Sequence, residues 1–180
     1  MRQVDWGVEA CSDSPADVEC AEFVKSCMGD MSETWDDFID EMMSYFTYGF
    51  SYHEIIYKRR LGPNKNSAKN SFYDDGRIGW RKLPGRRQTS LTRWEFGDDG
   101  GLKGVHQLVD GKYVFLPIER CLLFRTSNYV SNPEGVSFLR GAYRPWYFKK
   151  HIEEVEGIGI ERDLAGLPVI IAPEGVDLNS

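Results

Sequence analysis

The stretch SETWDDFIDEMMSYFTYGFSYHEIIYKRR, residues 32–60, changes its hydrophobic period at Gly49. Before that glycine, large apolar residues recur at the i, i+3, i+4, i+7 spacing of one helix face; they are Trp35, Phe38, Ile39, Met42, Met43 and Phe46. After it, the aromatic and β-branched residues of 50–60 are typical of a strand. We therefore expect a helix near 32–47 that ends at Gly49 and leads into a strand.

A second helix is predicted upstream, near 15–28. Ser14 suits the N-cap, Pro15 suits the first helical position, and Asp17 favours the positive end of the helix dipole. The two helices together make residues 1–49 an acidic N-terminal helical segment.

Three Asp-Gly pairs divide the middle of the chain: Asp75-Gly76, Asp99-Gly100 and Asp110-Gly111. Each predicts a tight hairpin turn, because a type I′ turn needs positive φ at both central residues. The runs RIGWRKL, SLTRWEF, LKGVHQL and KYVFLPI between them predict an antiparallel meander, and CLLFRTS (121–127) predicts a further strand.

Helical spacing returns from Val136 to about Asp163, and Pro145 either kinks this helix or marks its real start. GLPVIIAP (166–173) predicts one more strand. The predicted fold class is therefore α+β: an antiparallel β-meander flanked by two N-terminal helices and one long C-terminal helix. Residues 50–180, with the sheet and the long helix, form one domain after the segment 1–49.

The net charge of −6 conceals a segregation of sign along the chain. Residues 1–45 carry twelve acids and two bases, whereas residues 46–104 carry twelve bases and six acids. Such blocks suit subunits that meet acidic face on basic face, but they also suit two solvated faces that never touch. The candidate acidic contact residues are Asp36, Asp37 and Asp40, and their candidate basic partners on a neighbouring subunit are Arg86 and Arg87.

Residue types that carry catalysis or metal binding are scattered. The three histidines, His53, His106 and His151, lie far apart, and the four cysteines form no CxxC pair. We expect no enzyme, no metal and no cofactor, although an enzyme with an unrecognised site stays an alternative. No apolar run reaches the roughly 18 residues of a membrane span, so we expect no membrane partner.

Two basic stretches could bind phosphate or a protein partner. LPGRRQTSLTRW (83–94) contains Arg86, Arg87 and Arg93, and the surrounding loop 81–93 could make the chain a stand-alone nucleic-acid-binding module. NPEGVSFLRGAYRPWYFKKH (132–151) mixes aromatic and basic residues, which fits nucleic-acid binding, a partner surface or a buried helix. Its candidate subunit-contact or DNA-facing residues are Arg140, Arg144, Lys149 and Lys150.

The order of these segments resembles the portal proteins of tailed bacteriophages, in particular the family of Mu-like phages and prophages. The resemblance rests on YGFSYHEI (48–55), WRKLPGR (80–86), FRTSN (124–128) and PEGVSFLRGAYRPWYFKK (133–150). It extends from about Trp35 to Val169, over nearly the whole chain.

The resemblance implies a homo-oligomeric ring, usually of twelve subunits, at one vertex of the capsid. Such a ring passes double-stranded DNA and binds the terminase, capsid or scaffold proteins, and the head–tail adaptor. The implied location is the virion, with the bacterial host cytoplasm during assembly. This chain is similar to the outer, mixed α/β wing of such a subunit and is expected to be a fragment. We expect it alone to be a monomer or a weak, salt-sensitive oligomer.

Overall fold

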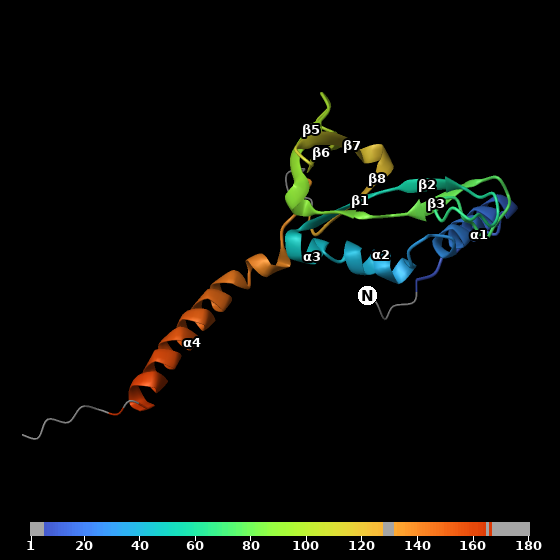
Figure 1. The fold of residues 1–180 in the computed structure, drawn as a ribbon. Coiled ribbons are helices and arrows are strands. Elements are labelled where there is room, and N and C mark those ends of the chain that lie inside the picture. The colour runs from blue at the N-terminus through green and yellow to red at the C-terminus, as the bar shows by residue number, and fades with distance from the viewer. Residues whose placement is uncertain (1–5, 128–131, 165, 167–180) are drawn as a thin grey trace, which may run out of the picture. The chain divides into compact units, whose positions relative to one another are not determined.

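A computed structural model describes residues 6–127, 132–164 and 166 of the chain. The chain forms two compact units, Met1–Leu139 and Arg140–Ser180. The first unit contains the strands and three helices, and the second contains one long helix (Figure 1).

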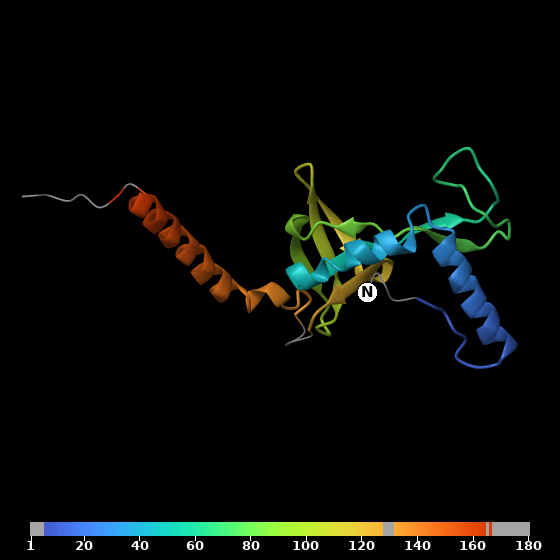
Figure 2. The same cartoon turned by 90° about the horizontal axis from the view of Figure 1, so that it is seen from below.

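The first unit is layered around strand β1 (Phe50–Glu54). This strand pairs antiparallel with β4 (Gly85–Arg86) on one side and with β8 (Cys121–Arg125) on the other. Helices α2 (Trp35–Met42) and α3 (Tyr45–Tyr48) lie along one face of this sheet (Figures 1 and 2). The strands β5 (Leu91–Phe96), β6 (Leu102–Val109) and β7 (Lys112–Pro117) lie over the other face.

Two further sheets complete the unit. Strands β2 (Ile56–Arg59) and β3 (Ile78–Lys82) pair antiparallel across the long loop 60–77. Strands β5 (Leu91–Phe96), β6 (Leu102–Val109) and β7 (Lys112–Pro117) form an antiparallel meander. Helix α1 (Pro15–Gly29) lies at the β2–β3 end of the unit in both views, and short 3₁₀ turns span Gln88–Ser90, Ile118–Arg120 and Phe138–Arg140.

Strand β1 is buried on both faces because successive side chains of a strand point to opposite sides. On one face, His53 lies in the core that Phe38, Ile39, Met42 and Leu83 form between α2 and the sheet. On the other, Tyr52 packs with Val105, Leu116 and Cys121, and its hydroxyl donates to the Leu116 carbonyl over 3.1 Å. Helix α2 of segment 1–49 therefore contributes to the same core as the strands.

The α+β class and the helices are confirmed, with two corrections to their bounds. The helix predicted near 32–47 is divided into α2 and α3, because Ser44 N–H bonds to the Glu41 carbonyl and tightens the turn between them. The long helix α4 spans Tyr143–Leu164, so its predicted start at Val136 is wrong. Pro145 lies in its first turn, where a missing N–H costs nothing, and thus marks the real start.

One of the three predicted type I′ turns is confirmed: Asp110 and Gly111 have φ of 48° and 76°, the two positive values that such a turn needs, and they join β6 to β7. Asp99-Gly100 does lie in the turn between β5 and β6, but Asp99 has no positive φ. The tight turn predicted at Asp75-Gly76 is wrong, because this pair lies in the long loop 60–77. The run 50–60 is two strands, β1 and β2, because Ile55 N–H instead donates to the Arg120 carbonyl. The strand predicted at 166–173 lies outside the described residues, apart from Gly166.

Candidate subunit-contact surfaces and the motif junction

Three stretches that carry the portal resemblance meet at one place, which we call the motif junction: Gly49, Thr126, Glu134, Gly135 and Val136. Thr126 N–H donates to the Gly49 carbonyl over 3.0 Å, and Thr126 Oγ1 accepts from Val136 N–H over 2.9 Å. The threonine therefore ties the end of α3 to the segment that leads toward α4.

Both glycines of the motif junction are required by space as well as by conformation. Gly49 has φ of 94° and Gly135 has φ of 61°. A Cβ on Gly135 would lie 2.5 Å from the Gly49 carbonyl oxygen, and one on Gly49 would lie 2.6 Å from the Glu134 carbonyl oxygen. Neither position accepts a side chain without a backbone shift.

Side chains extend the motif junction into the sheets and α3. Trp94 Nε1 on β5 donates to Glu134 Oε1 over 3.0 Å, and the Phe138 ring packs on Phe46 at a centroid distance of 5.0 Å. The path of residues 134–138 is therefore set by side chains from separate parts of the sequence, Phe46, Trp94 and Thr126.

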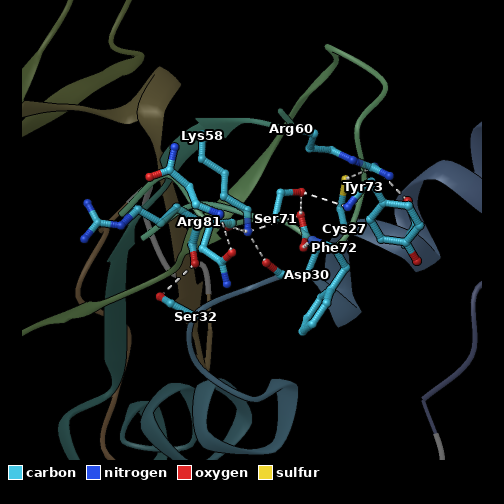
Figure 3. Close-up of polar contacts among 12 residues, drawn as sticks. Cys27, Asp30, Ser32, Lys58, Arg60, Ser71, Phe72, Tyr73 and Arg81 are labelled. Carbon is cyan, nitrogen blue, oxygen red and sulfur yellow. Dashed lines mark hydrogen bonds and ion pairs between the residues drawn. The ribbon is translucent and has the colours of Figure 1, made fainter. Parts of the chain in front are cut away.

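A second polar centre connects α1 to the loop 60–77 (Figure 3). Lys58 Nζ lies 3.1 Å from Asp30 Oδ2, and the two side chains are only 6% and 1% exposed. The same ammonium donates to the Asn70 carbonyl over 2.6 Å, while Asp30 accepts from Ser71 Oγ over 2.7 Å and from Phe72 N–H over 2.8 Å. The buried charges are thus paired and hydrogen-bonded, as burial demands.

The electrostatics of Asp30 follow from these contacts. Burial acts to raise the pKa of the carboxyl, but the hydrogen bonds from Phe72, Ser71 and Lys58 outweigh it, so that the pKa lies below its ordinary value. Because the folded value is lowered, the contribution of Asp30 to stability is present above pH about 4 and is lost as the pH falls through the folded pKa.

Arg60, the residue after β2, makes the neighbouring set of contacts. Its guanidinium lies 4.0 Å above the Tyr73 ring, donates to Ser26 Oγ over 2.8 Å and pairs with Asp75 at 3.0 Å (Figure 3 shows Arg60 beside Tyr73). No motif in the sequence identifies Asp30, Lys58 or Arg60 as a site. The contacts of these residues join distant parts of the chain, which a local pattern does not report.

The acidic and basic blocks of the sequence meet inside one chain. Ion pairs join Asp30 to Lys58, Glu19 to Arg77 and Glu33 to Lys82, each with its acid in the first 45 residues and its base in the middle third. The charge segregation is therefore used, at least in these pairs, to attach α1 and the turn after it to the β2–β3 hairpin.

The predicted basic residues of 81–93 lie on different elements. Arg86 on β4 is partly buried and pairs with Glu54 on β1. Arg87 is exposed just before the 3₁₀ turn, and Arg93 is exposed on β5, opposite His106 in the register. Lys82 and Arg86 are thus paired with Glu33 and Glu54 of the same chain, and this pairing reduces the positive charge that is available to bind a phosphate.

The predicted acidic residues lie on α2, and all three are exposed. Asp37 also closes a capping box: Thr34 Oγ1 accepts from Asp37 N–H over 3.1 Å, and Asp37 Oδ2 accepts from the Thr34 hydroxyl over 2.7 Å. Asp37 therefore has a structural role at the start of α2, and Asp36 and Asp40 extend the same exposed acidic surface.

Of the remaining candidates, Arg140 lies in a 3₁₀ turn and Arg144, Lys149 and Lys150 lie on α4. Every described side chain of α4 is exposed, among them Trp146 at 55% and Leu164 at 85%. The exposed large apolar residues of this helix are Tyr143, Trp146, Tyr147, Phe148, Ile152, Val155, Ile158, Ile160 and Leu164. Within the second unit, no described residue buries this helix.

The histidines do not converge. His53 is buried in the core, His106 lies 2.9 Å from Glu95, and His151 lies 3.6 Å from Glu154 on α4. Within residues 6–127, 132–164 and 166, no group of three or more His, Cys, Asp or Glu side chains could hold a metal ion. No helix in the described part of the chain is both long and apolar enough to cross a membrane.

The model of a protein family, the portal protein of Mu bacteriophage, matches residues 1–173. The chain belongs to this portal family, as the resemblance predicted. Membership implies oligomeric assembly with phage head components and a place at the portal vertex of the virion. The comparison with curated proteins returned no match.

Proposed function

We propose that this chain is the wing-like part of a subunit in a homo-oligomeric portal ring, usually of twelve subunits, through which double-stranded DNA is packaged and ejected. The family match over residues 1–173 carries the proposal. The exposed apolar side chains of α4 support it, because a ring subunit needs surfaces that only neighbours cover.

The proposed partners are further copies of the subunit, the terminase, capsid or scaffold proteins, and the head–tail adaptor. Assembly takes place in the bacterial host cytoplasm. We assign the chain no catalytic step and no cofactor. In the Lys58–Asp30 centre, the Ser71 hydroxyl does lie beside the Asp30 carboxylate, but both side chains are only 2% exposed, so a substrate has no access to them.

Contacts between subunits would also use charge. The exposed acids Asp36 and Asp40 on α2 are proposed to face exposed bases such as Arg87 on a neighbouring copy. Exposed pairs contribute only about 0–1 kcal/mol each, so they would set register and on-rate more than affinity.

Immunogold labelling of particles tests the location. Antibodies raised against this chain should label phage particles from an induced host strain that carries the gene, at one vertex of each head. Labelling spread over the head, labelling of tails alone, or an absence of the chain from purified particles would contradict the proposal.

Duplex binding by the isolated chain tests the alternative of a stand-alone nucleic-acid-binding module. A channel guides DNA without gripping it, so we expect at most weak binding. Tight binding that falls steeply between about 50 and about 200 mM salt, and that is lost on Arg87→Ala and Arg93→Ala, would favour the alternative. Arg86→Ala is a poor probe because that residue already pairs with Glu54.

A further inference from the structure

Helix α4 carries one seam that is apolar throughout, formed by Phe148, Ile152, Val155 and Gly159. Their spacing of four, three and four residues keeps them on one side of a helix, as in a coiled coil. The seam is about 16 Å long at 1.5 Å per residue. Its three large side chains are at least half exposed, from 52% to 68%, so no described residue of the second unit covers them.

No described contact within this chain explains why position 159 is a glycine. A glycine inside a helix costs about 1 kcal/mol relative to alanine. A Cβ added at Gly159 would meet no atom within 4 Å, so the neighbouring residues of this chain do not require the glycine. A large side chain of another chain packed against this point would give a reason for it.

The charges of α4 oppose the dipole of the helix. Residues 143–152 carry three bases and no acid, whereas residues 153–164 carry five acids and one base. Isolated helices are stabilised by the reverse order, with acids near the N-terminus. The ion pair Lys149–Glu153, at 3.4 Å, also has lysine first, which is the weaker order.

We propose that α4 pairs with α4 of a second copy of this chain, antiparallel, along the seam Phe148–Ile152–Val155–Gly159. A two-fold axis between residues 153 and 154 places Ile152 opposite Val155 and Phe148 opposite Gly159. The large ring then fills the space that the glycine leaves open. The same axis places the basic half of each helix beside the acidic half of the other, and the two dipoles oppose each other favourably.

One charge pair fixes the register of the two helices. Lys149 and Glu156 lie on the same flank of the seam, and the two-fold axis brings Lys149 of one copy within about 3 Å along the axis of Glu156 of the other. Each dimer therefore contains this pair twice. Lys150 lies about 170° around the helix from the seam and takes no part in it.

This contact is independent of the proposed function. A two-fold contact closes on itself and cannot propagate around a ring. The α4 dimer would cover the seam until the dimer dissociates. The dimer could form whether or not the chain enters a portal. Loss of portal labelling would leave the pairing intact, and failure of the pairing would leave the portal assignment intact.

Sedimentation velocity of the full chain over a wide range of concentration tests the pairing. We expect a concentration-dependent dimer that is weakened about tenfold by Lys149→Glu and similarly by Glu156→Lys, because each change sets two like-charged pairs against each other. The double variant K149E/E156K should restore the dimer. Lys150→Glu makes the same change of charge one residue from Lys149 but on the side of the helix away from the seam, so it should leave the dimer unchanged.

Glycine variants provide a second test. Gly159→Leu should raise the helicity of α4 by circular dichroism and yet weaken the dimer, since it fills the space opposite Phe148. Gly157→Leu, off the seam, should raise helicity without that loss. A chain that stays monomeric throughout, a dimer indifferent to K149E, or a double variant that is not rescued would overturn the proposal.

Discussion

Lys58 and Asp30 show how one residue pair can hold a loop that has little apolar content. Each is buried, and each has the other as its counter-charge. A buried pair adds little to stability over apolar residues of the same shape, yet the loss of one member is severe. The pair therefore acts as a structural requirement of the α1–loop contact.

Asp30→Asn should reduce the free energy of unfolding by about 3–5 kcal/mol, because it leaves the Lys58 ammonium buried without a counter-charge. Chemical denaturation measures the change, and trypsin should cleave faster after Lys65 and Lys69 in the released loop. Glu19→Gln, which removes the acid of an exposed pair, is the control and should change little. Equal effects of the two substitutions would contradict the structural role.

His53 makes stability depend on pH. Burial lowers the pKa of its imidazole, against smaller opposing effects of the Leu83 carbonyl and Glu41. The folded protein therefore keeps His53 neutral in a range where the unfolded chain binds a proton. Stability is unaffected above the ordinary pKa of about 6.5 and falls as the pH drops below it, by up to about 1.4 kcal/mol per pH unit.

Denaturation between pH 7.5 and about 5 tests this dependence. His53→Phe keeps ring contacts with Phe38 and Phe124 but cannot protonate, so its stability should vary less with pH over this range, even if it is lower overall. His106→Gln, at a partly exposed site beside Glu95, should retain the dependence. An unchanged slope in His53→Phe would assign the effect to other groups.

Among the elements, the segment after β8 depends most on the motif junction. Gly135→Ala should destabilise the first unit by about 1–3 kcal/mol, because the residue has positive φ and its Cβ would meet the Gly49 carbonyl oxygen. Gly141→Ala is the matched control, since a Cβ there meets nothing within 4 Å. Thermal unfolding compares the two. A neutral Gly135→Ala would show that the segment can move away without cost.

For the chain as an assembly of two units, the packing predicts that residues 1–139 fold without α4. The two hydrophobic core clusters of the described residues lie wholly within the first unit, whereas α4 belongs to the second. A chain that ends at Leu139 should unfold at nearly the temperature of the full chain and should lose the α4-dependent dimer. A large drop in its unfolding temperature would show that α4 supports the core.

Local patterns were enough to predict the α+β class, α1, the β5–β6–β7 meander and its Asp-Gly turns. These depend on spacing and on φ preferences that neighbouring residues carry. The division of the strand 50–60 was not predicted, because Ile55 N–H bonds to the Arg120 carbonyl, which lies far away in the sequence. The division of the helix 32–47 was not predicted either, because the local bond from Ser44 N–H to the Glu41 carbonyl leaves the apolar spacing unchanged. The start of α4 was left open because Pro145 fits a kink as well as a first turn.

The family was recognised from the order of its motifs, but the contacts between those motifs came only from the tertiary structure. Gly49 lies far from Thr126 and Gly135 in the sequence, and it meets them because β1 pairs with β8. Lys58 meets Asp30 because α1 packs beside the β2–β3 hairpin. A linear pattern reports the preference of each segment for helix or strand, whereas buried charges and close backbone contacts depend on which segments fold against one another.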